Sequence, residues 1–168
     1  VTIDSFDDIY ITGQSGTLRK IDSDGNEIWS FTNHGNSTVR AVAIDSNGSV
    51  YTGADDYTVK KIDPSGNEVW SFSGHTDRVY GVAVDSSGNV YSGSADNTVK
   101  KIDSSGNEIW SFDGHSGYVY SVAVDSSGNV YSGSSDNTVK KIDSSGNEIW
   151  SFDGHSGYVY SVAVYLDY

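Results

Sequence analysis

Short apolar segments alternate along the chain with short polar connectors, and this pattern predicts β-strands. The clearest set is Val79–Val84, Val90–Ser94, Thr98–Asp103 and Glu108–Phe112. These segments are rich in Val, Ile, Tyr and Trp, which favour a pleated, packed surface. The connectors consist mainly of Gly, Asn, Asp and Ser, which favour turns. No stretch has a helical period, so the pattern predicts an all-β protein with four strands per unit.

The four-strand unit recurs at a fixed period. The four tryptophans lie at intervals of 41, 40 and 40 residues, and residues 85–112 differ from residues 125–152 only at Ala95 against Ser135. A period of this size is typical of proteins built from one repeated supersecondary unit. The predicted units span about residues 1–31, 39–72, 79–112 and 119–152.

The two ends of the chain depart from this regularity. The first unit is the most divergent, and its opening strand is reduced to Val1–Asp4. After the fourth unit, residues 154–164 repeat residues 114–124 without a change. We therefore expect one extra C-terminal strand, at about residues 158–164, that opens a fifth unit and is never followed by its other three strands.

Composition narrows the function classes. With 23 acidic and 10 basic side chains, the formal charge is −13, which argues against binding to nucleic acid or to an anionic membrane. There is no cysteine, and no apolar run is long enough for a transmembrane helix or a signal peptide. The chain starts with Val, which indicates a processed, excised or engineered start. We expect a cytoplasmic protein.

Several elements follow one another in a fixed order, complete in the fourth unit and with substitutions in the others: Gly-His, Val-x-Ser-Val-Ala-Val, Tyr-Ser-Gly-Ser, an Asp, and Thr-Val-Lys-Lys-Ile-Asp. This order resembles the WD40-type repeat of β-propellers. The resemblance implies antiparallel four-stranded blades around a central channel, and thus a propeller segment of four blades plus one strand. It also implies structural pairs between the Gly-His histidine and the Asp of the turn after the second strand. The matching pairs are His34 with Asp56, His75 with Asp96, and His115 with Asp136.

The sequence departs from the WD40 pattern at the dipeptide that names it. Ile-Asp stands where Trp-Asp is usual, and the tryptophans lie on the fourth strand instead. This placement resembles, more weakly, the tryptophan-docking repeats of quinoprotein-like propellers, whose turn is one residue longer. That second resemblance implies that the indoles dock between blades; they are Trp29, Trp70, Trp110 and Trp150. The near-identity of the units resembles recently amplified bacterial blades, of the cyanobacterial kind, or a protein engineered from them.

No constellation in the sequence indicates catalysis. Ser, His and Asp recur together in every unit, which fits a repeated structural hydrogen bond better than a single hydrolase triad. The histidines lie too far apart for a metal cluster, and Asp22–Glu27 lacks most ligands of a calcium loop. We expect no enzyme, no metal and no cofactor.

The chain contains twelve tyrosines, an unusually high number. Tyr118 and Tyr158 precede an innermost strand and are candidates for a binding surface, because tyrosine is rigid and amphipathic. The equally weighted alternative is that these rings fill the wedge between blades.

Four WD40-type blades are not expected to close a ring, and an open arc exposes sheet edges and apolar faces. We therefore expect self-association, with two chains giving eight blades, a nine- or ten-blade ring being the less favoured variant. The C-terminal strand would supply the innermost strand of the next chain's first blade through Tyr158, Val159, Tyr160, Val162 and Val164. The expected function is a non-catalytic scaffold for protein or peptide recognition; the alternative is a lectin-like binder that uses Tyr, Asp and Asn in its loops.

Overall fold

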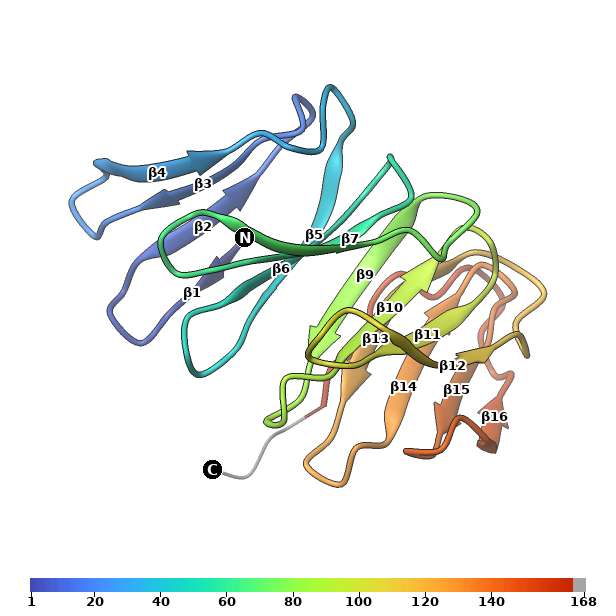
Figure 1. The fold of residues 1–168 in the computed structure, drawn as a ribbon. Coiled ribbons are helices and arrows are strands. Elements are labelled where there is room, and N and C mark those ends of the chain that lie inside the picture. The colour runs from blue at the N-terminus through green and yellow to red at the C-terminus, as the bar shows by residue number, and fades with distance from the viewer. Residues whose placement is uncertain (165–168) are drawn as a thin grey trace.

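The computed structural model describes residues 1–164, which form four antiparallel sheets and no helix. Each sheet contains four strands in sequence order and is one blade of a propeller segment (Figure 1). The strands are β1 (Thr2–Ile3), β2 (Ile9–Thr12), β3 (Leu18–Ile21), β4 (Glu27–Phe31), β5 (Val39–Ile44), β6 (Val50–Ala54), β7 (Val59–Ile62), β8 (Glu68–Phe72), β9 (Val79–Val84), β10 (Val90–Ser94), β11 (Val99–Ile102), β12 (Glu108–Phe112), β13 (Val119–Val124), β14 (Val130–Ser134), β15 (Val139–Ile142) and β16 (Glu148–Phe152).

The hairpins between the third and fourth strands are fixed by aspartate and glycine. In the second blade the carboxylate of Asp63 accepts hydrogen bonds of 2.9 Å from the backbone N–H groups of Ser65 and Asn67. Gly66 has a φ of 89°, a left-handed conformation that glycine adopts at little cost. The predicted third strands are one residue too long at each end. Thr98, for example, lies in a turn because its hydroxyl donates to Asp96.

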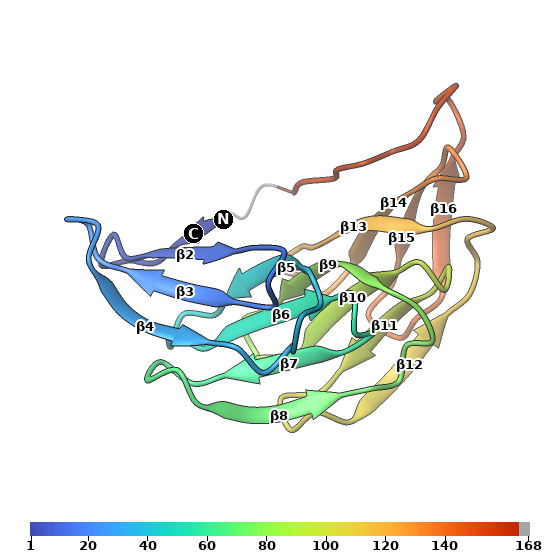
Figure 2. The ribbon, with the colours of Figure 1, turned by 90° about the horizontal axis from the view of Figure 1, so that it is seen from above.

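The blades follow one another around an arc, with β5, β9 and β13 side by side along its inner edge (Figure 2). Three apolar clusters lie between successive blades. In each, one blade contributes a buried Tyr, Val or Leu, and Phe, and the next blade contributes Val and Ile. The buried members are Tyr10, Leu18, Phe31, Val50 and Ile62; Tyr51, Val59, Phe72, Val79, Val90 and Ile102; and Tyr91, Val99, Phe112, Val119, Val122, Val124, Val130 and Ile142.

Neighbouring blades approach closely at one glycine of the second strand in the second and third blades. A Cβ placed on Gly93 would lie 2.7 Å from Cγ1 of Val119, on the innermost strand of the next blade. Gly53 is equally close to Val79, at 2.6 Å. Such distances are too short for real Cβ atoms, so glycine is required for this packing.

Residues 158–164 occupy the place of a fifth innermost strand but form no strand of a sheet. The N–H of Val159 donates to the carbonyl of Ser134 at 2.9 Å, as Val39 donates to Gly13 at 3.1 Å. A Cβ on Gly133 would lie 2.7 Å from Cγ1 of Val159, which repeats the contact of Gly93 with Val119. The expected strand differs in one respect, because no described segment pairs with its other edge to form a ladder.

The first blade is incomplete in the complementary way. Its innermost strand β1 has two residues, which lie opposite Tyr10 and Ile9. Ile11 and Thr12 of β2 therefore have no partner on that side among the described residues, whereas β5 pairs with all five residues of β6. Val1, which precedes β1, is largely exposed. Residues 1–164 thus begin with a blade that lacks most of an innermost strand and end with a segment that lies in the place of an innermost strand.

Candidate assembly site

Each of the three predicted His–Asp pairs lies within hydrogen-bond distance. In the third blade Nδ1 of His75 is 2.8 Å from Asp96, and Nε2 is 2.7 Å from the hydroxyl of Ser92. His34 with Asp56 and His115 with Asp136 have the same arrangement, at 2.8 Å, with the hydroxyls of Thr52 and Ser132.

Burial sets the charge state of these networks. Burial lowers the pKa of His34 and of His115, so both rings are neutral at pH 7. Burial alone would raise the pKa of Asp136, but hydrogen bonds from Thr138 and His115 outweigh it and lower the pKa to about 2. A neutral ring donates from Nδ1 to the carboxylate and accepts at Nε2 from the hydroxyl.

These networks lack the geometry of a hydrolase. A triad needs a nucleophile that a substrate reaches. The hydroxyl-bearing residues Thr52, Ser92 and Ser132 are fully buried. Every polar group of the network is also occupied by another member of it. The arrangement supports a structural role that ties the turn after the second strand to the loop before the first.

The histidine of the last Gly-His, His155, is exposed and has no such partner among residues 1–164. In the first blade Ser15 lies where the other blades have the paired Asp, and Ile11 lies where they have the hydroxyl residue. The two ends therefore do not offer a fourth complete His–Asp network.

Three of the four tryptophans dock against the following blade. The indole N–H of Trp29 donates to the carbonyl of Pro64 at 3.0 Å, Trp70 to Ser104 at 3.1 Å, and Trp110 to Ser144 at 3.1 Å. Each indole lies beside the glycine of the same hairpin. A Cβ on Gly66 would lie 3.0 Å from the Trp29 ring.

Trp150 has no following blade in this chain, and it is 41% exposed. The hairpin that would receive an equivalent tryptophan lies at the other end of the chain, at residues 22–26. Its glycine, Gly25, has a φ of 86°, close to that of Gly66, and no atom lies within 4 Å of its Cβ position. Asp22 accepts from the backbone of Asp24 and Asn26 as Asp63 does in its own turn. One end has a tryptophan without a hairpin, and the other has a hairpin without a tryptophan.

The apolar faces at the two ends match in the same way. Phe152 is 52% exposed, whereas its equivalent Phe112 is 8% exposed because a fourth blade covers it. Tyr131 and Val139 lie beside it on the same face of the last blade and are only partly buried. Ile9 and Ile21 of the first blade correspond to the Val and Ile that complete each internal cluster. Each end therefore carries apolar residues of the kinds that form the internal interblade clusters.

Two groups of tyrosines differ in burial. Those of the second strands are buried, or half-buried at Tyr131, and donate to an aspartate of their own blade, as Tyr51 does to Asp45 at 2.9 Å. Tyr118 and Tyr158 are 46% and 57% exposed and lie near Tyr120, at ring distances of 6.4 and 6.2 Å. The second group offers an aromatic surface at the inner edge of the arc.

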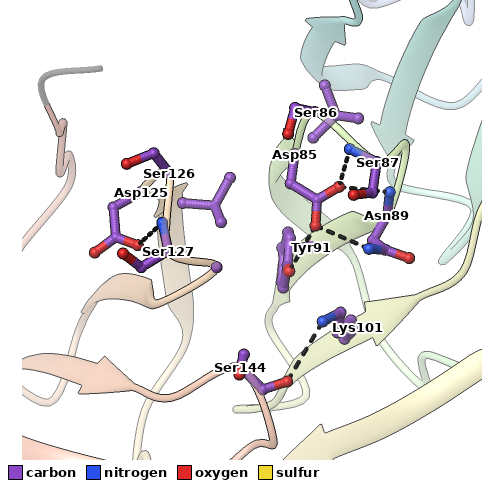
Figure 3. Close-up of a pocket in the computed structure, with 13 residues that line it drawn as sticks. Asp85, Ser86, Ser87, Asn89, Tyr91, Lys101, Asp125, Ser126, Ser127 and Ser144 are labelled. Carbon is purple, nitrogen blue, oxygen red and sulfur yellow. Dashed lines mark hydrogen bonds between the residues drawn. The ribbon is translucent and has the colours of Figure 1, made fainter. Parts of the chain in front are cut away.

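A pocket of about 520 Å³ lies between the turns of the third and fourth blades (Figure 3). Its carboxylates, Asp85 and Asp125, accept hydrogen bonds within their own blades, as Asp85 does from Ser87, Asn89 and Tyr91. Its lysine, Lys101, lies over the Tyr91 ring and donates to the carbonyl of Ser144. These polar groups therefore already hold the turns in place. No group of three metal-ligating side chains occurs in the described part of the chain.

The fold, with its four antiparallel blades around an inner row of strands, defines a β-propeller. The family model described as outer membrane protein assembly factor BamB matches residues 55–164, more than half of the chain. The chain therefore belongs to this family of propeller repeats. A model of the WD domain, G-beta repeat, matches residues 25–63. The predicted WD40-type resemblance is confirmed, and the BamB match covers the larger share of the sequence.

Among solved structures, the chain is similar to the computationally designed Ika8 protein, with a TM-score of 0.81 and 28% sequence identity. The alignment covers 92% of this chain and 48% of the designed one, so this chain spans about half of the designed protein. No curated protein matches the sequence. Within residues 1–164, no helix is long and apolar enough to cross a membrane.

Sequence reasoning missed one feature of the inner edge. Arg40 lies on β5 at the level where β9 and β13 have Tyr80 and Tyr120, and its guanidinium lies 5.0 Å from the centre of the Tyr80 ring. Its fork also donates to both carboxylate oxygens of Asp55. An alignment of the units could have revealed Arg40, because the second unit has Arg where the third and fourth have Tyr80 and Tyr120.

Proposed function

We propose that this chain is a non-catalytic scaffold that completes its propeller by joining a second copy of itself, which gives a ring of eight blades. The split interblade core carries this proposal. Phe152 and Trp150 lie exposed on the last blade, and the first blade carries the matching apolar residues and an unoccupied hairpin at residues 22–26. Two copies joined end to end would form two junctions, and each junction would bury the last blade of one copy against the first blade of the other.

The register of the exchanged strand follows from the complete blades. In the second blade Ala43 lies opposite Tyr51 and Ile44 opposite Val50. By the same register, Ala163 of one copy would lie opposite Tyr10 of the other, and Val164 opposite Ile9. Strand β1 holds these two places in the free chain, so it must be displaced. Displacing β1 costs little free energy, because this strand contributes only two residues to the ladder.

The number of copies follows from the blade count. Propellers contain about four to eight blades, and two copies reach the upper end of that range. Each junction joins the end of one copy to the beginning of the other, and two such junctions close a ring with twofold symmetry. This chain covers about half of the similar designed protein, which supports a ring made from two copies.

Solution mass tests this proposal. Light scattering coupled to size exclusion should give twice the chain mass of 18.0 kDa. A variant truncated after Asp153 should be monomeric, because it loses the donated strand, whereas a variant truncated after Val164 should stay dimeric. A monomeric full-length chain would contradict the proposal.

Recognition of a protein or peptide is the role that the inner surface supports best. Tyr118 and Tyr158 are exposed and rigid, which suits peptide side chains. A glycan-binding role finds less support, because the Asp and Asn of the turns hydrogen-bond within their own turns: Asp85 accepts from the backbone N–H and from the side-chain amide of Asn89. Peptide and glycan arrays probed with the dimer separate the two. Peptide binding that the Tyr118→Ser variant loses supports recognition; binding to glycans alone contradicts it.

A further inference from the structure

The inner edge of the arc carries a continuous row of side chains at one level. The row is Arg40, Tyr80, Tyr120 and Tyr160, one from each successive innermost segment. Arg40 lies 5.0 Å from the Tyr80 ring, Tyr80 lies 5.3 Å from Tyr120, and Tyr120 lies 5.0 Å from Tyr160. Each member thus contacts the next at nearly the same distance.

The row has two different ends. At one end Tyr160 is 67% exposed, and its aromatic neighbours among residues 1–164 are Tyr120 and Tyr158. At the other end the guanidinium of Arg40 lies over the ring of Tyr80. The first blade supplies no inner-strand side chain at this level, because β1 begins at Thr2, which pairs with Tyr10 as Ala43 pairs with Tyr51.

The guanidinium of Arg40 is held ready for a second aromatic ring. Asp55 binds it through two hydrogen bonds, and these hydrogen bonds raise the pKa of Arg40. A guanidinium is planar and stacks on aromatic faces, so it has two faces for two rings. Because Asp55 binds its edge, the face turned away from Tyr80 stays available for stacking.

We propose that Tyr160 of one copy packs on the free face of Arg40 of the second copy, so that each junction places this guanidinium between two tyrosine rings. The proposal rests on the ring closure proposed above and specifies its contact at the channel mouth. In the closed ring the row becomes a belt of two arginines and six tyrosines. The belt also favours the end-to-end arrangement, since Tyr160 meets a cation only at the beginning of another copy.

A double-mutant cycle measures this contact. The dimer dissociation constant is determined by analytical ultracentrifugation for Tyr160→Leu, Arg40→Gln and the double variant. Stacking on a cation contributes about threefold to fivefold at each partly exposed contact, so two junctions should give a coupling of about tenfold or more. The Arg40→Lys variant keeps the positive charge but not the planar guanidinium, so it should recover only part of the lost dimer affinity.

The matched control is the cycle of Tyr120→Leu with Arg40→Gln. Tyr120 lies in the same row but does not contact Arg40, so the losses of dimer affinity caused by the two substitutions should be additive. Additive effects of Tyr160→Leu and Arg40→Gln in a dimeric protein would overturn this contact and leave ring closure intact. A monomeric wild type would overturn both. Thermal unfolding of each variant in monomeric form reports separately on the intrachain contacts of Arg40 with Asp55 and Tyr80.

Discussion

Replacing Trp150 by Ala separates assembly from folding. Trp150 is 41% exposed in the single chain, while the internal indoles are covered by the next blade's hairpin. A buried Trp removes up to about 250 Å² from water, and the internal indoles stay partly exposed, so closure would hide at most about 100 Å² more of this side chain. At about 25 cal/mol per Å², this contributes at most about 2.5 kcal/mol per junction.

A hydrogen bond to Ser23 of the second copy would add to this value. The internal indoles donate to the equivalent carbonyls, such as that of Ser144, at 3.0–3.1 Å, and a bond of this kind contributes about 1 kcal/mol. Two junctions together then contribute at most about 7 kcal/mol, and the Trp150→Ala dimer should dissociate up to about 10⁵-fold more readily. Sedimentation over a range of protein concentrations measures this change directly.

Trp110→Ala is the matched control, because the same side chain lies between two blades of one chain. It should lower the free energy of unfolding by about 3–5 kcal/mol, since it leaves a cavity in an internal core. Trp150→Ala should leave the unfolding of the isolated chain nearly unchanged. If Trp150→Ala weakened the dimer less than tenfold, or destabilised the chain as much as Trp110→Ala, the reasoning would be refuted.

Three further predictions concern the junction, the blade contacts and pH. Ser15→Asp should place a carboxylate near His155 of the second copy and strengthen the dimer severalfold in sedimentation, because it restores the pairing of the other blades. Gly93→Ala should destabilise the chain by about 1–3 kcal/mol in denaturant unfolding, since its Cβ would meet the next blade. The free energy of unfolding should be constant near pH 7–8. It should fall below about pH 6.5, because the lowered pKa of His115 keeps the ring neutral in the folded chain while the unfolded chain takes up the proton. It should fall further from about pH 4 toward pH 2, because Asp136, whose pKa in the folded chain is about 2, is then protonated.

Each of these has an outcome that contradicts it. A lower dimer affinity of the Ser15→Asp variant would show that the new carboxylate is buried at the junction without a hydrogen bond to His155 of the second copy. Gly13→Ala is the control for Gly93→Ala, because no atom lies within 4 Å of its Cβ position. Equal destabilisation by both would exclude the close blade contact as the cause. A stability that stays level from pH 8 to pH 3 would contradict the assigned charge states.

The blade architecture could be predicted from the sequence because the repeat multiplies weak local signals. A single Asp-Ser-Ser-Gly-Asn turn is ambiguous, but its recurrence at a constant distance from Trp and from Gly-His fixes the strand order. The strand limits were less accurate at Thr98, where a side-chain hydrogen bond keeps the residue in the turn. Strand ends depend on such local competition, which composition does not resolve.

The contacts between blades were harder to predict. The tryptophan acceptors are backbone carbonyls, such as that of Ser104, and a carbonyl has no signature in the sequence. Arg40 was overlooked because a single arginine in an acidic chain resembles an ordinary surface charge. Its importance comes from its level on β5, which places it in line with Tyr80, and that alignment depends on the arc of the blades.

The docking of residues 158–164 on the fourth blade bears on the rate of association. Val159 is already buried and hydrogen-bonded to Ser134, so the donated segment has been ordered before two chains meet. A segment that orders only on binding loses conformational entropy at that step, and one already in place does not. Only the two residues of β1 have to leave their positions on the accepting side. Association should therefore proceed at about 10⁵–10⁷ M⁻¹s⁻¹, the range of preformed protein surfaces, rather than at the slower rate of an exchange that requires unfolding.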